Sequence, residues 1–189
     1  MSEKLLFIDT ETTGLFNFKE PADAPGQPRL ASLAGILCDG KDIVSSVEFL
    51  IKPDDWAMTK EASAINGLTD DGLSAFGVPV KVVLEWYDAM LSLNPTIISH
   101  NVKFDTKVMR GELRRAGMLD RFTTTKTFCT MRQAAKLMGK GITVSLKDAV
   151  RYFMSEDVVG AHNAIHDVRY CKALYFTMQE KADEVLAHA

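Results

Sequence analysis

Three short apolar runs near the beginning of the chain predict β-strands. The runs cover residues 4–9, 33–38 and 43–51, and each is bounded by polar or turn-forming residues, as strands usually are. Asp39 and Gly40 lie between the second and third runs and favour a tight hairpin turn. We therefore expect a sheet that begins with antiparallel strands.

The segment Phe16–Leu30 follows neither a helical nor a strand pattern. It contains Pro21, Pro25, Gly26 and Pro28, which interrupt regular structure, and it is long for a connection inside a compact domain. Two interpretations stay open: a functional flap, or a surface excursion that the fold tolerates.

Beyond Pro53 the apolar positions change to a helical period. One apolar stripe predicts a helix that faces the core, and its members are Val82, Val83, Trp86, Met90 and Leu91. A buried strand is expected over 95–99. The helix after this strand should pack through Phe104, Val108 and Leu113.

Two later helices are also expected. Ser145 is a suitable N-cap, because its hydroxyl can accept a hydrogen bond from the first turn, and Asp148 supports this start. The last long helix should run from about 163 to 181, with a packing face of Ile165, Val168, Leu174 and Phe176. Strands first, then helices alternating with strands, predict an α/β domain with a mixed sheet.

Composition indicates an ordinary globular protein. A chain of 189 residues allows one domain with a sizeable core, so we expect a single domain over 1–189. No apolar run approaches the roughly 18 residues of a membrane span, and the first residues do not resemble a signal peptide. We therefore expect a cytoplasmic protein that does not associate with a membrane. Three widely spaced cysteines, Cys38, Cys129 and Cys171, are expected to be buried thiols.

The net charge of −3 gives no indication of nucleic-acid binding, but basic residues are concentrated in one stretch. This stretch contains Lys103, Lys107, Arg110, Arg114, Arg115, Arg121 and Lys126, opposed by Asp105, Glu112 and Asp120. It is either an electrostatic footprint for a phosphate backbone or an ordinary solvated helix face.

Two carboxylates, Asp9 and Glu11, end the first predicted strand. Side chains alternate along a strand, so both acids point to the same face while Thr10 points to the other. Crowded carboxylates raise each other's pKa, so a fold usually neutralises such a pair with a metal ion or a basic side chain. The pair could equally be a solvated strand end.

Two further acids occur later in the chain. Asp105 is expected in the first turn of a helix, where it either reaches a cation held by Asp9 or simply complements the helix dipole. Asp167 lies five residues after His162, a separation of about 500° on a helix, so these two do not share a face. Gly160 would let the chain turn and bring His162 toward the acid.

Histidine is a suitable general base because imidazole titrates near working pH, and His162 is the candidate. His166 should point roughly 100° away from Asp167 and is a weaker candidate, whereas His100 is expected to be hydrogen-bonded locally. Four carboxylates without a cysteine favour Mg²⁺ or Mn²⁺. Two such ions about 3.5–4 Å apart are suited to hydrolysis of a phosphodiester.

These motifs resemble those of the DEDDh exonuclease family. The resemblance rests on the sequence DTETTG at 9–14, on His100 and Asn101 followed by Phe104 and Asp105, and on His162 followed by Asp167. The related tyrosine subclass has a tyrosine where this chain has Asn163, so the resemblance is to the histidine subclass. It implies a ribonuclease-H-like fold, a five-stranded mixed sheet flanked by helices.

The resemblance also implies a role for each motif residue. Asp9 would bridge two Mg²⁺ or Mn²⁺ ions, Glu11 and Asp167 would complete one site, Asp105 would complete the other through water, and His162 would deprotonate the attacking water. The 3′-terminal nucleotide would contact Thr10, Thr12, Thr13, Gly14, Leu15, Ile65, Asn66, Asn101 and Phe104. Asn66 is a departure, because the family often has histidine there.

The function implied by the resemblance is a metal-dependent 3′→5′ exonuclease that releases nucleoside 5′-monophosphates from single-stranded or frayed DNA. Its partners would be nucleic acid with a free 3′ end and, as a candidate, a DNA polymerase. Two alternatives stay open. One is an exoribonuclease, since the motifs do not distinguish the sugars; the other is a nucleic-acid-binding module without turnover, against which the intact set of acids argues.

Overall fold

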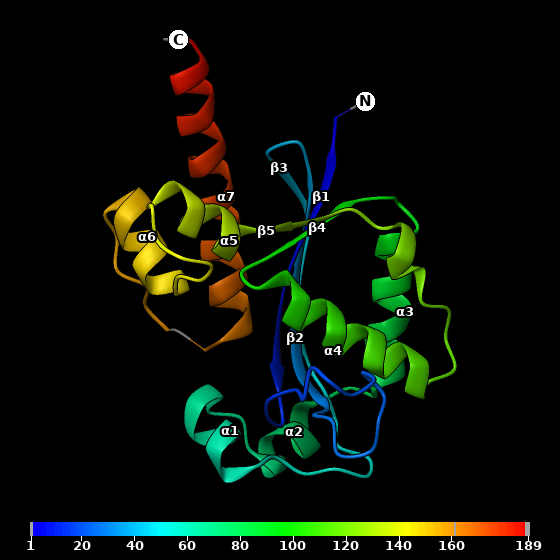
Figure 1. Cartoon of the computed structure of the whole chain (residues 1–189). Helices are drawn as coiled ribbons and strands as arrows, with labels where there is room; N and C mark the ends of the chain where they lie inside the picture. Colours follow the sequence, from blue (N-terminus) through cyan, green and yellow to red (C-terminus); the bar gives the residue numbers. More distant parts are fainter. Residues whose placement is uncertain (1, 161, 188–189) are drawn as a thin grey trace.

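The computed structural model describes residues 2–160 and 162–187. In this part of the chain five strands form one sheet in the order β3-β2-β1-β4-β5 (Figure 1). Strand bounds are Lys4–Thr12 for β1, Leu30–Asp39 for β2, Asp42–Leu50 for β3, Thr96–Ser99 for β4 and Thr127–Cys129 for β5. The expected strands are confirmed, and β1 continues beyond residue 9.

The sheet is mixed, as expected. β1, β2 and β3 are joined antiparallel, whereas β4 runs parallel to β1 and β5 runs parallel to β4. Gly40 has φ +60 in the turn between β2 and β3, which is the predicted hairpin. β1 is central, and its acids lie just beyond the stretch that pairs with β4, which covers Leu5–Phe7.

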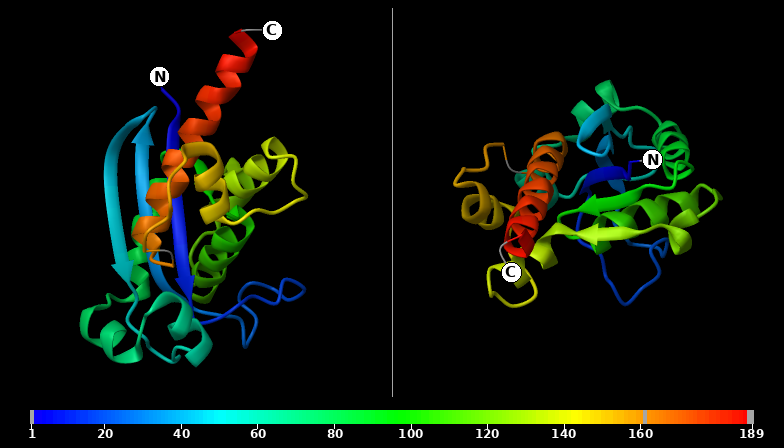
Figure 2. Two further views of the ribbon diagram at one scale, coloured as in Figure 1. Left: turned by 90° about the vertical axis from the view of Figure 1, so that its left-hand side faces the viewer. Right: turned by 90° about the horizontal axis from the view of Figure 1, so that it is seen from above.

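Helices cover both faces of the sheet (Figure 2). α3 (Val80–Leu91) and α4 (Val102–Arg115) pack on one face, where Leu6 and Ile8 of β1 are buried. α7 (Ala164–Ala187) packs on the other, against Leu5 and Phe7. The alternation of β1 therefore continues so that Asp9 and Glu11 face the side of α7.

Four shorter α-helices also belong to the described fold. They are α1 (Lys60–Asn66), α2 (Asp70–Phe76), α5 (Thr130–Leu137) and α6 (Leu146–Met154). α1 and α2 lie near the end of β1, and α5 and α6 pack against α7 (Figure 1). The Thr59 hydroxyl caps α1 by accepting from Ala62 N at 3.1 Å. The Ser145 hydroxyl caps α6 by accepting from Asp148 N at 3.1 Å, which confirms the predicted start.

One expected core position is wrong. Val82 is 45% exposed, whereas Val83, Leu84 and Tyr87 of the same helix are buried. The buried stripe of α3 is rotated relative to the predicted one, because α3 packs through these residues against α4 and the sheet. A residue adjacent to the stripe then points about 100° away from it.

The irregular segment between β1 and β2 is fastened to α4, beneath which it lies in Figure 1. Lys107 Nζ donates to the carbonyl oxygens of Asn17 and Glu20 at 3.1 and 2.8 Å. The Gln27 amide donates to the carbonyl of Pro21 at 2.9 Å. These bonds favour the interpretation as a fixed surface excursion.

The three cysteines are free thiols; Cys38 and Cys171 are buried as expected, whereas Cys129 is only partly buried. Within 2–160 and 162–187, no helix combines the length and apolar character needed to cross a bilayer.

Candidate active site

The end of β1 brings the first two acids to one face of the sheet. Asp9 pairs with Ala34 and Glu11 with Ser32 of β2, so the strand is still regular where both acids project. The register shifts between Glu11 and Thr12, and the chain leaves the sheet there. The Thr12 hydroxyl then donates to the Gly14 carbonyl at 2.6 Å, which closes the turn.

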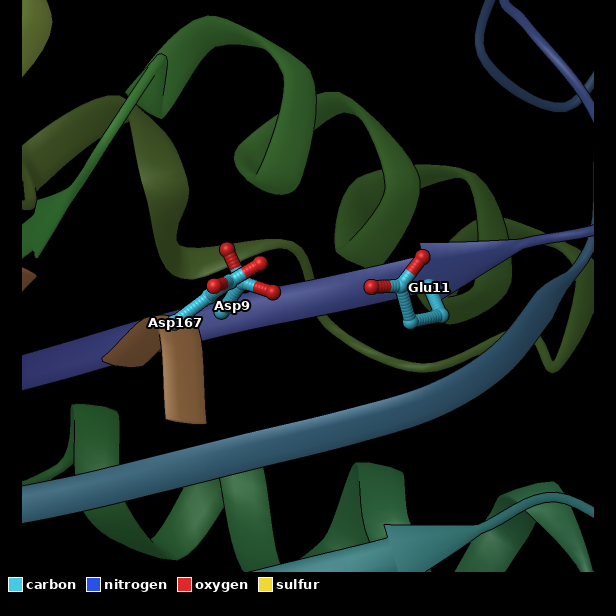
Figure 3. A group of neighbouring side chains, drawn as sticks. All are labelled: Asp9, Glu11 and Asp167. Atoms are coloured by element: carbon cyan, nitrogen blue, oxygen red, sulfur yellow. The ribbon is translucent and has the colours of Figure 1, made fainter. Parts of the chain in front are cut away.

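The first turn of α7 adds a third acid to this pair. Ligand oxygens of Asp9, Glu11 and Asp167 all lie within 4.8 Å of one another. Figure 3 shows the Asp167 carboxylate beside that of Asp9, with Glu11 further along β1. Residues separated by most of the chain thus form one acidic cluster.

Burial raises the pKa of every acid in the cluster, and repulsion from neighbouring acids adds to this for Asp9 and Glu11. Burial raises the pKa of Asp9 well above its usual value, and the charges of Asp105, Asp167 and Glu11 add to this. Burial raises the pKa of Glu11 to about 8, with a further contribution from Asp167. The cluster is therefore costly when ionised, unless a cation neutralises it.

The cluster has the properties of a divalent-metal site. Oδ1 of Asp167 is buried and has no hydrogen-bond partner among the described residues, although buried polar atoms are nearly always satisfied. The donors are carboxylate oxygens, which suit Mg²⁺ and Mn²⁺. An unpartnered oxygen inside a group of repelling acids fits an ion that the three carboxylates would share.

Asp105 approaches the cluster from the opposite face of the sheet. It lies in the first turn of α4, as predicted, and is buried. Its Oδ1 accepts from Thr10 N at 3.0 Å and from Thr10 Oγ1 at 2.8 Å, and its Oδ2 accepts from the Ser99 hydroxyl. Burial raises the pKa of Asp105 to about 6, while these bonds lower it.

His162 lies on the connection that leads into α7. Gly160 and His162 have φ of +72 and +62, so the chain turns here as the sequence suggested. The backbone N–H of His162 donates to Asp167 Oδ2 at 3.0 Å. The side chain of His162 is exposed and lines the cleft described next.

A cleft of about 580 Å³ opens beside the acids. Glu11 and His162 line this cleft. Seven other residues that the sequence predicted for the site line it too: Thr10, Thr12, Gly14, Leu15, Ile65, Asn66 and Phe104. Leu15 and Ile65 are 89% and 60% exposed, so the cleft presents large apolar side chains beside its acidic floor.

Two predicted contact residues lie elsewhere. The Thr13 hydroxyl accepts from Arg29 N at 2.9 Å and faces the segment before β2. Asn101, with φ +91, precedes α4 and does not line the cleft. Thr13 follows the cleft residue Thr12, and Asn101 precedes the helix that carries Phe104. As substrate contacts, both residues stay predictions.

The sequence pointed to Ile65 and Asn66 of α1, but not to the rest of the wall that this helix and its N-cap contribute. Thr59, Glu61 and Ala62 line the cleft, and the Thr59 hydroxyl donates to the Thr13 carbonyl at 2.9 Å. The Asn66 amide donates to the Thr12 carbonyl at 3.4 Å. The available signal was Thr59 as an N-cap, which predicts a helix but not what the helix faces.

The remaining candidate residues have local roles. His100 is hydrogen-bonded to Thr130 Oγ1 at 3.0 Å and to the Val144 carbonyl at 2.9 Å, as expected, and burial lowers its pKa. His166 contacts the Val159 carbonyl through Nδ1 at 3.3 Å. Neither histidine lines the cleft.

Solved structures share this fold. E. coli exonuclease I bound to single-stranded DNA in a zinc form has a TM-score of 0.79 at 20% identity, covering 99% of this chain and 42% of that chain. Exonuclease I of Methylocaldum szegediense gives 0.74 at 22% identity, with 94% and 40% covered. The chain spans less than half the length of these proteins, and at this identity the likeness establishes the fold, which is ribonuclease-H-like as expected.

Sequence comparisons address the family directly. A comparison with curated protein sequences finds no match. A family model described as RNase T, exonuclease, matches residues 6–175, a range that contains Asp9, Glu11, Asp105, His162 and Asp167. The chain therefore belongs to the RNase T exonuclease family, the DEDDh type that its motifs resemble.

Proposed function

We propose that the chain is a metal-dependent 3′→5′ exonuclease that acts on single-stranded or frayed DNA and releases nucleoside 5′-monophosphates. One observation carries the proposal: the Asp9, Glu11 and Asp167 carboxylates cluster within 4.8 Å beside a cleft that Glu11 and His162 line. E. coli exonuclease I, which has this fold, binds a dA16 oligonucleotide in one structure at 20% identity. That complex supports single-stranded DNA as the substrate.

The acids would hold two ions, Mg²⁺ or Mn²⁺. Asp9 would contact both, Glu11 and Asp167 would complete one site, and Asp105 would complete the other. The hydrogen bonds from Thr10 to Asp105 Oδ1 support this arrangement, because they hold the Asp105 carboxylate against β1 at the residue between Asp9 and Glu11. When bound, such ions stabilise the attacking and leaving oxygens of the phosphodiester.

His162 would accept the proton of the attacking water. Its exposed side chain reaches the cleft that Glu11 also lines, and exposure lets it exchange the proton with solvent. The N–H of its own backbone is bound to Asp167, so the base and a metal ligand are held by one short connection.

The cleft would hold the 3′-terminal nucleotide. The exposed side chains of Leu15 and Ile65 offer apolar surface for the terminal base, while Thr12 and Asn66 define the turn beneath it. Phe104 forms the wall on the side of α4. Apolar side chains beside Glu11 suit a base whose scissile phosphate would lie on the ions that the acids hold.

The test is digestion of a single-stranded DNA oligonucleotide that carries a fluorophore at its 5′ end and a free 3′ hydroxyl. With Mg²⁺ or Mn²⁺ we expect a ladder that shortens from the 3′ end and nucleoside 5′-monophosphates as products. EDTA should abolish the reaction, and so should a 3′-phosphorothioate block. Activity that persists in EDTA would exclude the mechanism.

Substitutions assign the roles in the same assay. Asp167→Ala should abolish cleavage, and His162→Ala should lower kcat by about 10²-fold or more, the usual effect of losing a general base. Asp42→Ala, at the exposed start of β3, is the matched control and should leave kcat unchanged. Wild-type turnover in either site variant rejects its assigned role.

An RNA oligonucleotide of the same sequence separates the DNA enzyme from the exoribonuclease alternative, and we expect slower cleavage of RNA. A protein that binds the DNA oligonucleotide without cleaving it would instead be a binding module. The DNA polymerase partner, the cytoplasmic location and a single domain over 1–189 stay predictions.

A further inference from the structure

A second hollow lies outside the candidate active site, along α4. It has a volume of about 480 Å³ and is bounded by α4, by the segment before β2, and by Phe122 and Thr127. We call it the α4 groove. In the described part of the chain, four basic side chains of α4 line it: Lys103, Lys107, Arg110 and Arg114.

The spacing of these four residues places them in one row. Steps of four, three and four positions return to the same face of a helix. From Lys103 to Arg114 the row rises roughly 16 Å at about 1.5 Å per residue. A stacked strand places about four or five phosphates in that length, at about 3.4 Å per nucleotide.

The row keeps an excess of positive charge. Arg110 Nε lies 2.7 Å from Asp120, and Arg114 lies 3.5 Å from both Asp120 and Asp23. The hydrogen bonds of Lys107 go to neutral carbonyl groups. With Glu20 in the lining, four cations face three acids, so the groove is positive in a chain whose net charge is −3.

Two aromatic rings also line the α4 groove. Phe18 is 57% exposed, and Lys107 Nζ lies 4.9 Å from its ring centre. The Arg110 guanidinium lies 4.8 Å from the ring centre of Phe122. Sites for single-stranded nucleic acid combine cations that follow the backbone with aromatic rings on which bases stack.

A row of ring contacts connects the α4 groove to the active-site cleft. Phe104 lines the cleft, its ring centre lies 5.7 Å from that of Phe16, and Phe16 lies 6.3 Å from Phe18 in the groove. Lys103 begins the basic row one residue before Phe104. The two hollows are therefore neighbours on the side of α4.

We propose that the α4 groove binds the part of a DNA single strand that lies 5′ of the terminal nucleotides. This inference rests on the proposed exonuclease function and adds to it a binding site that only longer substrates reach. The row of α4 binds phosphates, and Phe18 stacks on a base. Affinity then depends on oligonucleotide length, whereas the chemical step at the 3′ end does not.

The experiment compares a short and a long substrate in the presence of Mn²⁺. One is the p-nitrophenyl ester of thymidine 5′-monophosphate, which fills only the cleft, and the other is dT20. Lys103→Glu should raise KM for dT20 about tenfold or more and leave kcat/KM for the ester within about twofold. Phe18→Ala should show the same pattern with a smaller rise.

The matched control is Lys4→Glu, the same charge change at the exposed start of β1. It should leave KM for dT20 unchanged. Lys103→Glu should fold, because an acid in the first turn suits the helix dipole; the ester assay verifies this. For Lys103→Ala, log KM for dT20 should depend less steeply on log salt, by about 0.7 for one lost phosphate contact.

The outcomes separate the two proposals. If the unmodified protein fails to hydrolyse either substrate, the proposed function is wrong. If it hydrolyses both, but Lys103→Glu and Phe18→Ala leave KM for dT20 unchanged, the α4 groove is not a strand site. A groove that binds polyglutamate but not dT20, measured by fluorescence anisotropy with the Asp167→Ala protein, would likewise overturn the inference in favour of an acidic protein partner.

Discussion

At the scale of single residues, the surroundings of the acidic cluster make the ionised form of its carboxylates unfavourable. Burial is the largest cause of the raised pKa of Asp9, Glu11 and Asp167, and their mutual charges contribute further to the first two. Protons and divalent cations therefore compete for the same oxygens. The metal-free protein should lose stability when the acids ionise.

The sign of this effect follows from Glu11. Its pKa is raised from 4.5 to about 8 on folding, so the folded state binds more protons than the unfolded state between these values. The free energy of unfolding therefore falls as pH rises through this window. In EDTA we expect Tm to decrease from about pH 5 to pH 8 because this carboxylate ionises.

Glu11→Gln removes the charge and should flatten this pH dependence. At pH 8 its Tm in EDTA should exceed that of the unmodified protein by about 2–4 °C, the shift expected for about 1 kcal/mol in a domain of this size. Glu85→Gln, on the exposed side of α3, serves as the control. Equal slopes of Tm against pH in Glu11→Gln and the unmodified protein would contradict the argument.

At the scale of secondary-structure elements, α7 anchors the connection that carries His162. Tyr170 Oη accepts from Val159 N at 3.3 Å and donates to the Asp157 carbonyl at 3.4 Å. His166 Nδ1 contacts the Val159 carbonyl at 3.3 Å. A Cβ at Gly160 would approach His166 Nδ1 to 2.5 Å, so glycine permits this close contact.

We therefore expect Tyr170 to be a positioning residue for His162. Tyr170→Phe should lower kcat on dT20 by roughly 3–10-fold, the effect of about 1 kcal/mol from the loss of the two long hydrogen bonds of the hydroxyl, with KM unchanged. Tyr152→Phe, which alters an exposed tyrosine of α6, should have no effect.

A double variant distinguishes positioning from a general structural role. Once His162→Ala has removed the base, Tyr170→Phe should lower kcat no further, because the hydroxyl acts through that side chain. An undiminished additional loss in the double variant would show that Tyr170 acts elsewhere.

At the scale of the whole molecule, the sheet order brings the site together. β1 lies between β2 and β4, α7 covers the face of Asp9 and α4 covers the face of Thr10. Asp9 and Asp167 are far apart in sequence, so their repulsion exists only in the folded chain. A cation that binds the cluster should therefore stabilise the entire fold.

Saturating Mn²⁺ should raise Tm relative to EDTA. Binding at about 100 times Kd contributes roughly 2.7 kcal/mol, or about 5–10 °C for a domain of this size. Asp9→Asn should reduce this rise to a small fraction, and KCl at equal ionic strength should not reproduce it. A Tm that is indifferent to Mn²⁺ in the unmodified protein would argue against a metal site at the cluster.

Local physics allowed much of the fold to be predicted from the sequence. Alternation along β1 placed Asp9 and Glu11 on one face, and the hydroxyl of Ser145 marked the start of α6. Both depend on contacts within a few residues. The spacing of Asp9 and Glu11 alone left a solvated strand end equally open, and the chemistry was indicated by the resemblance of DTETTG and the later motifs to the DEDDh family.

Long-range packing decided the rest. Val82 and Val83 differ in burial only because of how α3 docks on its neighbours, and Asp105 bonds to Thr10 and Ser99 only because β4 lies beside β1. Thr59, Glu61 and Ala62 likewise line the cleft only because of where α1 packs in the folded chain. The sequence by itself determined which side chains carry charge and which face of their element they occupy; the tertiary structure decided which of them meet, because contacts between distant segments depend on the packing of whole elements.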